Sequence, residues 1–260
     1  MRFKNAVLRT QYAVRTMLSV DFHTHIGKSK SDGAEVTGPE ICRAVFNPKL
    51  RLSRAVVFPI DEARPGISYS RANSKIAAAV KQFPRLIGFC RLNPHAGNKA
   101  LLEMERSFRI GLVGVKLHPR AEAFRPALAA GILKELNRRT RPLILHTSHE
   151  ENCRPSEWFG LLSRFRDFPV ILAHGGKDAF REGILVAKKL RNVYLETSTL
   201  SYHRTRMILE EVGARKIVFA SDFPYSHPSV EMEKWNQIWS IKEKREILSN
   251  NALKILEPWL

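Results

Sequence analysis

Eight short apolar runs recur along the chain, and this repetition restricts the folds that the sequence can adopt. They lie at residues 18–25, 54–60, 85–92, 112–118, 142–147, 169–174, 193–197 and 216–222. The runs are nearly continuous instead of alternating with polar residues, which is typical of parallel strands buried on both faces. Eight such strands, alternating with helices, predict a parallel sheet that closes into a single (β/α)8 TIM barrel.

The segments between the runs carry apolar residues three and four positions apart, as amphipathic helices do. The predicted helices cover residues 70–82, 99–109, 126–138, 157–165, 180–189, 202–212 and 241–256. An open doubly wound sheet is the alternative fold, but the chain contains neither a G-x-G-x-x-G motif nor a P-loop. We expect residues 17–260 to form one barrel. Residues 1–16, which are basic and contain no acid, are expected to be an N-terminal extension.

The amino-acid composition limits which cellular compartment and which binding partners we expect. The net charge is +18, but lysine and arginine are spread evenly over both halves of the chain, so we do not expect a nucleic-acid partner. Three cysteines without metal-ligand spacing indicate reduced thiols and a cytoplasmic protein. No apolar segment is long enough to span a bilayer, so we expect no membrane partner.

Residues capable of binding metal gather at the carboxyl ends of the predicted strands, where this fold places active sites. They are His23, His25, Lys116, His118, His146, His174 and Asp222. His23 and His25 are two positions apart and therefore point to the same side of an extended strand. Neutral imidazoles are good ligands for zinc and related ions. The pattern therefore predicts a metal site, in preference to separately satisfied histidines.

The same residues lie in motifs that resemble those of the amidohydrolase superfamily, in its compact amidohydrolase-related group. The motifs are DFHTH (21–25), GVKLHP (114–119), LILHTS (143–148), ILAHGG (171–176), VYLETS (193–198) and ASDFPY (220–225), within a resemblance that covers residues 17–256. The resemblance implies that His23, His25 and Asp222 bind a metal ion. It also implies that His146 binds the same ion or a second one.

Chemical roles follow from the residue types. One or two divalent ions, for which we expect Zn2+, would lower the pKa of bound water from about 15.7 to about 7. Asp222 would take a proton from that water and return it to the leaving group. His174 would polarise a substrate carbonyl or complete a second metal site. His118, which faces the same way as Lys116, could bind the substrate, and Arg91 could clamp an anionic group.

Lys116 allows two interpretations. In some binuclear members of the superfamily, a lysine at the end of the fourth strand is carboxylated and bridges two metal ions. Alternatively, Lys116 is a cation that binds a substrate carboxylate or pairs with a neighbouring acid. Carboxylation cannot be read from a sequence, so both interpretations stay open.

The leading functional hypothesis is a metal-dependent hydrolase that cleaves an amide, lactone or other ester bond in a small substrate, anionic ones included. A non-oxidative decarboxylase that uses the same metal residues is the alternative. A TatD-like nuclease is disfavoured, because that family usually has a glutamate where this chain has Lys116. The complete ligand set argues against a barrel that has lost catalysis. A homodimer is expected from the habit of the superfamily.

Overall fold

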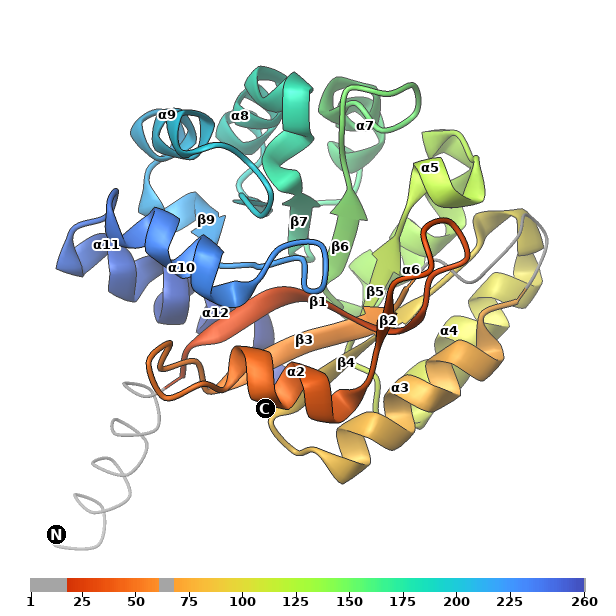
Figure 1. Cartoon of the computed structure of the whole chain (residues 1–260). Coiled ribbons are helices and arrows are strands. Elements are labelled where there is room, and N and C mark those ends of the chain that lie inside the picture. The colour runs from red at the N-terminus through yellow and green to blue at the C-terminus, as the bar shows by residue number, and fades with distance from the viewer. Residues whose placement is uncertain (1–17, 61–67, 260) are drawn as a thin grey trace, which may run out of the picture.

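Parallel pairing dominates the computed structural model, which describes residues 18–60 and 68–259 (Figure 1). The predicted extension at residues 1–16 lies outside the described residues. The sheet has the order β2-β1-β3-β4-β5-β6-β7-β8-β9, in which only β2 is antiparallel to its neighbour. The strands are β1 (Val20–Lys28), β2 (Glu35–Val36), β3 (Arg54–Pro59), β4 (Leu86–Arg91), β5 (Gly114–Leu117), β6 (Leu143–His146), β7 (Val170–Ala173), β8 (Val193–Glu196) and β9 (Ile217–Val218).

The segment after β9 closes the sheet against β1. The Phe22 amide donates to the Phe219 carbonyl at 2.9 Å, and the Asp222 amide donates to the His23 carbonyl at 2.7 Å. The eight parallel strands therefore form a (β/α)8 barrel, as predicted. The run predicted at residues 216–222 is a regular strand only up to Val218, because beyond it the chain is held to β1 by these separate bonds.

Helices follow the strands in sequence and surround the sheet (Figure 1). They are α2 (Gly38–Val45), α3 (Ser70–Gln82), α4 (Asn98–Arg109), α5 (Pro119–Glu122), α6 (Ala130–Arg139), α7 (Pro155–Leu162), α8 (Phe180–Lys189), α9 (Tyr202–Val212), α10 (Pro228–Asn236), α11 (Ile241–Arg245) and α12 (Asn251–Leu256). The sequence did not predict α2, α5 or α10, which are short or weakly periodic. Within the described ranges, we find no helix with both the length and the apolar character needed to cross a membrane.

Two predicted helices are interrupted. The one at 126–138 begins with a 3-10 turn, η2 (Pro126–Ala129), and the one at 241–256 contains a π turn, η5 (Glu246–Asn250). Within η5, the Ser249 hydroxyl donates to the Leu18 carbonyl, and directly after it the side-chain amide of Asn251 donates to the Ile217 carbonyl at 2.6 Å. These two bonds tie the C-terminal helical segment to the residue two positions before β1 and to β9.

The strands are apolar on both faces because the barrel has an inner and an outer core. In β3, Val56 and Phe58 belong to the inner cluster, whereas Ala55 and Val57 pack in the outer cluster between strands and helices. This double burial explains why the apolar runs are continuous. It also means that polar side chains facing inward at the carboxyl ends of the strands are exceptions that need a chemical explanation.

Two helical glycines test how tightly the outer layer packs. A Cβ added to Gly183 in α8 would overlap the carbonyl group of Gly175, whereas one added to Gly160 in α7 would meet no atom within 4 Å. We expect Gly183→Ala to lower the free energy of unfolding by about 1–3 kcal/mol. Gly160→Ala should raise it by roughly 0.5–1 kcal/mol, because alanine favours helix. Urea unfolding followed by circular dichroism measures the free energy of unfolding of both variants. Equal changes in the two would contradict the tight packing at Gly183.

Candidate metal centre

Two histidines and one aspartate form a buried group at the carboxyl end of the barrel. His23 comes from β1, His174 follows β7, and Asp222 follows β9. Each offers one ligand atom, and these atoms all lie within 4.8 Å of one another. His23 Nε2 lies 3.0 Å from Asp222 Oδ1. Two imidazoles and a carboxylate are a donor set that suits a divalent ion such as zinc.

His25 extends this group. Its Nε2 atom lies 3.0 Å from the same Oδ1 atom of Asp222. Burial lowers the pKa of His25 to about 4, so the ring is neutral near pH 7. Its Nδ1 atom is buried and has no hydrogen-bond partner among residues 18–60 and 68–259. A buried nitrogen without a partner is unfavourable, so the predicted ligand His25 fits a site that is completed by a further group.

Glu196 holds the group in place. His23 Nδ1 donates to its Oε1 atom at 2.8 Å, and the His174 amide donates to the same atom at 2.8 Å. Burial alone would raise the pKa of Glu196, but the hydrogen bond from His23 and the charges of His174 and His23 lower it to about 2. Because His23 Nδ1 is engaged, its Nε2 atom is left to face Asp222 and an ion.

Glu196 is not among the site residues predicted from the sequence. The sequence did contain a signal for Glu196, because this acid is the last residue of an apolar strand and therefore lies at the carboxyl end of the barrel. A buried acid at that position requires a donor or a metal nearby. The sequence alone does not show which histidine supplies the donor.

Lys116 and Asp222 place opposite charges close together. Lys116 Nζ is fully buried and lies 3.3 Å from His23 Nε2, and burial lowers the lysine pKa to about 7. Burial alone would raise the pKa of Asp222, but the charges of His23 and His174 outweigh burial and hold that pKa well below its usual range. Asp222 is therefore a carboxylate and can serve as ligand or base.

His146 and His118 lie beside the group. Their rings stack with centroids 3.7 Å apart, and the His146 centroid is 5.0 Å from that of His174. Burial lowers the pKa of both rings well below the ordinary value. In the described part of the chain, His146 Nε2 has no hydrogen-bond partner. The structure thus brings His174, instead of His146, into the closest group, and the ligand role of His146 stays a prediction.

A cavity of about 500 Å3 opens onto these side chains. Its lining comprises His23, His25, Ser31, Asp32, Lys116, His118, Arg120, Ala121, His146, His174, Lys177, Thr199, Asp222 and Tyr225. All predicted site residues except Arg91 are in this lining. Positive side chains outnumber the acids among them, and Lys116 is fully buried.

Arg91 lies behind the site. Its side chain is fully buried, and its NH2 group lies 2.8 Å from Glu122 Oε1, with Nε at 2.9 Å from the same oxygen. Glu122 ends α5, whose preceding residue, His118, lines the cavity. A buried charge requires such a partner. Arg91 therefore anchors α5 in this structure, and the predicted substrate clamp is not what its contacts show.

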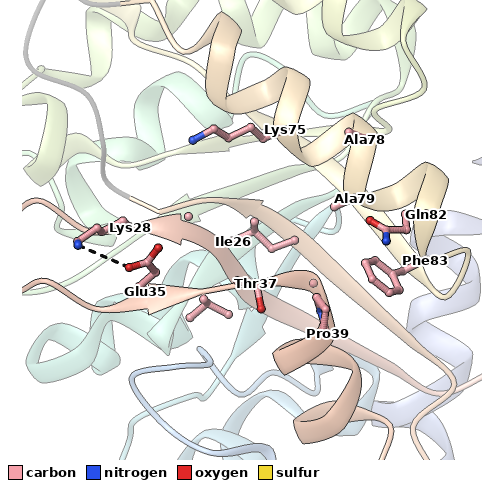
Figure 2. A pocket seen from close by; sticks show the side chains of 13 residues that line it. Ile26, Lys28, Glu35, Thr37, Pro39, Lys75, Ala78, Ala79, Gln82 and Phe83 are labelled. Carbon is pink, nitrogen blue, oxygen red and sulfur yellow. Dashed lines mark ion pairs between the residues drawn. The ribbon is translucent and has the colours of Figure 1, made fainter.

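A second cavity of about 430 Å3 lies between the β1–β2 hairpin and α3 (Figure 2). Figure 2 shows Gln82 and Phe83 at one end and the ion pair of Lys28 with Glu35, at 3.5 Å, at the other. No histidine lines this cavity, and Glu35 is its only acid among the described residues. It therefore offers no comparable set of metal ligands.

The fold and the side chains define a barrel enzyme with a buried centre for a divalent metal ion at the carboxyl ends of its strands. The chain belongs to the amidohydrolase family, whose sequence model matches residues 20–257. No curated protein sequence matches the chain.

Solved structures of similar fold cover nearly the whole chain. A protein proposed to be an amidohydrolase from Staphylococcus aureus has a TM-score of 0.74 at 18% identity, over 93% of this chain and 100% of that one. The 2,6-dihydroxybenzoate decarboxylase from Rhizobium has 0.69 at 16%, over 93% and 99%. A protein proposed to be a 2-pyrone-4,6-dicarboxylic acid hydrolase from Pseudomonas putida has 0.68 at 15%, over 94% and 99%. At these identities the similarity establishes the fold alone.

Replacing the carboxylate that orients His23 tests the centre. We expect Glu196→Gln to weaken metal affinity by about 10–100-fold, because the amide no longer fixes the ring nitrogen that faces the ion. Competition with a chromogenic chelator measures the affinity. Glu103→Gln is the matched control, since Glu103 is a buried acid bonded to Asn73, Arg106 and Ser107, away from the cavity. Equal losses in both variants would indicate general destabilisation instead.

Proposed function

We propose that this protein is a metal-dependent hydrolase that cleaves an amide, lactone or other ester bond in a small substrate. The observation that carries the proposal is the buried group of His23, His174 and Asp222 at the base of an open cavity. A divalent ion bound there supplies a Lewis acid that makes water acidic enough to act as a nucleophile near neutral pH. The family membership of the chain supports this chemistry.

The protein's own residues divide the remaining work. Asp222, held as a carboxylate beside His23 and His25, takes a proton from the attacking water and delivers it to the leaving group. His174 has Nδ1 at 3.0 Å from the Ser198 hydroxyl, which leaves its other nitrogen for the ion or for the substrate carbonyl. Glu196 keeps His23 and His174 oriented throughout.

We propose Zn2+ as the ion, because histidine nitrogen with one carboxylate is a common zinc donor set. A structurally similar dihydroxybenzoic acid decarboxylase from Polaromonas contains bound manganese, so metal analysis has to distinguish the two. An ammonium at Lys116, 3.3 Å from His23 Nε2, would be repelled by a divalent ion at that nitrogen. This repulsion favours a neutral or carboxylated Lys116 in the metal-bound enzyme.

Decarboxylation is the second candidate. The positive side chains of the cavity, Lys116, Arg120 and Lys177, would attract a carboxylate substrate. Decarboxylases also share the barrel, as the Rhizobium enzyme shows. We further propose a cytoplasmic enzyme, which its free cysteines Cys42, Cys90 and Cys153 support, acting on a small molecule. The homodimer stays a prediction.

Metal content per chain tests the centre and the role of Lys116. We expect wild-type protein, purified without a metal-affinity tag, to contain zinc that is lost in His23→Ala and strongly reduced in Asp222→Asn. About two ions, falling to one or none in Lys116→Ala, would indicate a carboxylated bridge. About one ion, retained in Lys116→Ala, would indicate a mononuclear site. Elemental analysis gives the count, and Lys75→Ala is the control. Absence of metal from the wild type would refute the proposal.

Product analysis separates the two reactions. With a panel of lactones, amides and aromatic carboxylates in 18O-water, we expect one 18O atom in the product and no release of carbon dioxide. Asp222→Asn should lower kcat by about 100- to 10,000-fold, because the proton acceptor is lost. Mass spectrometry and a carbon dioxide assay provide the readouts. Carbon dioxide release with solvent deuterium at the reacting carbon would establish the decarboxylase instead.

A further inference from the structure

Lys177 is a cavity-lining cation without a protein partner. It lies in η3 (His174–Ala179), the turn that also carries His174, and its side chain is half-buried at the cavity. No described residue forms a hydrogen bond or ion pair with its ammonium group. The charge of Lys177 contributes to lowering the pKa of Glu150 and Asp178, but these acids are bound by other groups: Ser148 and Arg120 contact Glu150, and Arg204 contacts Asp178. The ammonium is therefore available to a ligand.

The backbone of Lys177 is strained. Its φ and ψ angles are 49° and −118°, a left-handed conformation that favours glycine, and the preceding Gly175 and Gly176 also have positive φ. A non-glycine residue in such a conformation destabilises the folded backbone. A third glycine would avoid that cost. The presence of lysine where glycine fits better points to a function of its side chain.

The other charged groups of the cavity have polar partners in the protein, and the Asp32 carboxylate accepts from the Ala34 amide at 3.0 Å. Arg120 lies 3.3 Å from Glu150, and Asp222 is held by His23 and His25. The second cation, Lys116, is fully buried at the base beside His23. Lys116 and Lys177 thus mark two depths of one cavity, the first at the reacting centre and the second nearer to solvent.

We propose that Lys177 binds a carboxylate of the substrate that is remote from the bond being broken. The substrate would be a small molecule with its reacting group at the metal centre and an acidic group at its outer end. This inference rests on the proposed function only in placing the reacting group at the centre. Lys177 is then a specificity-determining residue, and it selects substrates that carry a carboxylate at the outer end over substrates whose outer end is uncharged.

Dicarboxylate binding to the metal-loaded protein tests this directly. The probes are malonate, succinate, glutarate and adipate, with butyrate as the monocarboxylate, measured by isothermal titration calorimetry. We expect at least one dicarboxylate to bind about 10-fold more tightly than butyrate, the effect of one added charge-assisted contact. The preference should disappear in Lys177→Met and Lys177→Gly and persist in Lys177→Arg. Lys75→Met, which removes a lysine from the second cavity, should retain it.

Thermal unfolding separates this role from a structural one. We expect Lys177→Gly to melt at a higher temperature than Lys177→Met, because only glycine relieves the left-handed backbone, while both lose the preference for dicarboxylates. A preference that survives both substitutions, or a wild type that binds the whole series no more tightly than butyrate, overturns the proposal. Metal content measured on the same samples shows separately whether the proposed function fails.

Discussion

The site depends on the seam of the barrel, where β1 meets the segment that follows β9. Asp21 is fully buried in β1, and its Oδ1 atom accepts hydrogen bonds from the amides of His23 at 3.1 Å and Ser221 at 2.9 Å. Burial raises the pKa of Asp21 to about 7, although hydrogen bonds from Ser221 and His23 oppose the rise. This carboxyl group ties two segments separated by nearly the whole chain. The seam is what sets His23 and Asp222 at 3.0 Å.

The charges near the seam balance in an unusual way. Glu196 and Asp222 stay ionised in a buried environment, whereas burial lowers the pKa of His25 and His174 to about 4. Both carboxylates contact the ring of His23, and although burial and the charge of Lys116 oppose it, Asp222 and Glu196 raise the pKa of that imidazole. The rings of His25 and His174 are neutral near pH 7. Buried charge that is only partly compensated is unfavourable. A divalent ion would supply the positive charge that His25 and His174 do not, which is why this arrangement is more consistent with a metal centre than with a satisfied polar core.

The sequence predicted the barrel because each strand is buried on both faces and so appears as an uninterrupted apolar run. It also predicted that His23, His174 and Asp222 lie at the same end, since all parallel strands share that end. It could not predict that His174 is nearer to the group than His146, because that depends on the left-handed turn after β7. Nor could it show that Arg91 is covered by Glu122, because local patterns do not reveal which loop folds over a strand end. The roles of His25 and His146 as ligands are still predictions.

The turn after β7 carries both a residue of the metal centre and the residue that we propose selects the substrate. It begins with His174 at the centre and reaches Lys177 three residues later, so both side chains are positioned by one short piece of backbone. Gly183 of α8 packs directly on the Gly175 carbonyl, which supports that backbone from behind. A shift of the turn would therefore move the histidine and the lysine together. Strand residues such as His23 fix the position of the reacting group. Lys177 in this turn instead determines whether the substrate needs a remote carboxylate. Substitutions of Lys177 can therefore alter specificity without altering the ligands on β1.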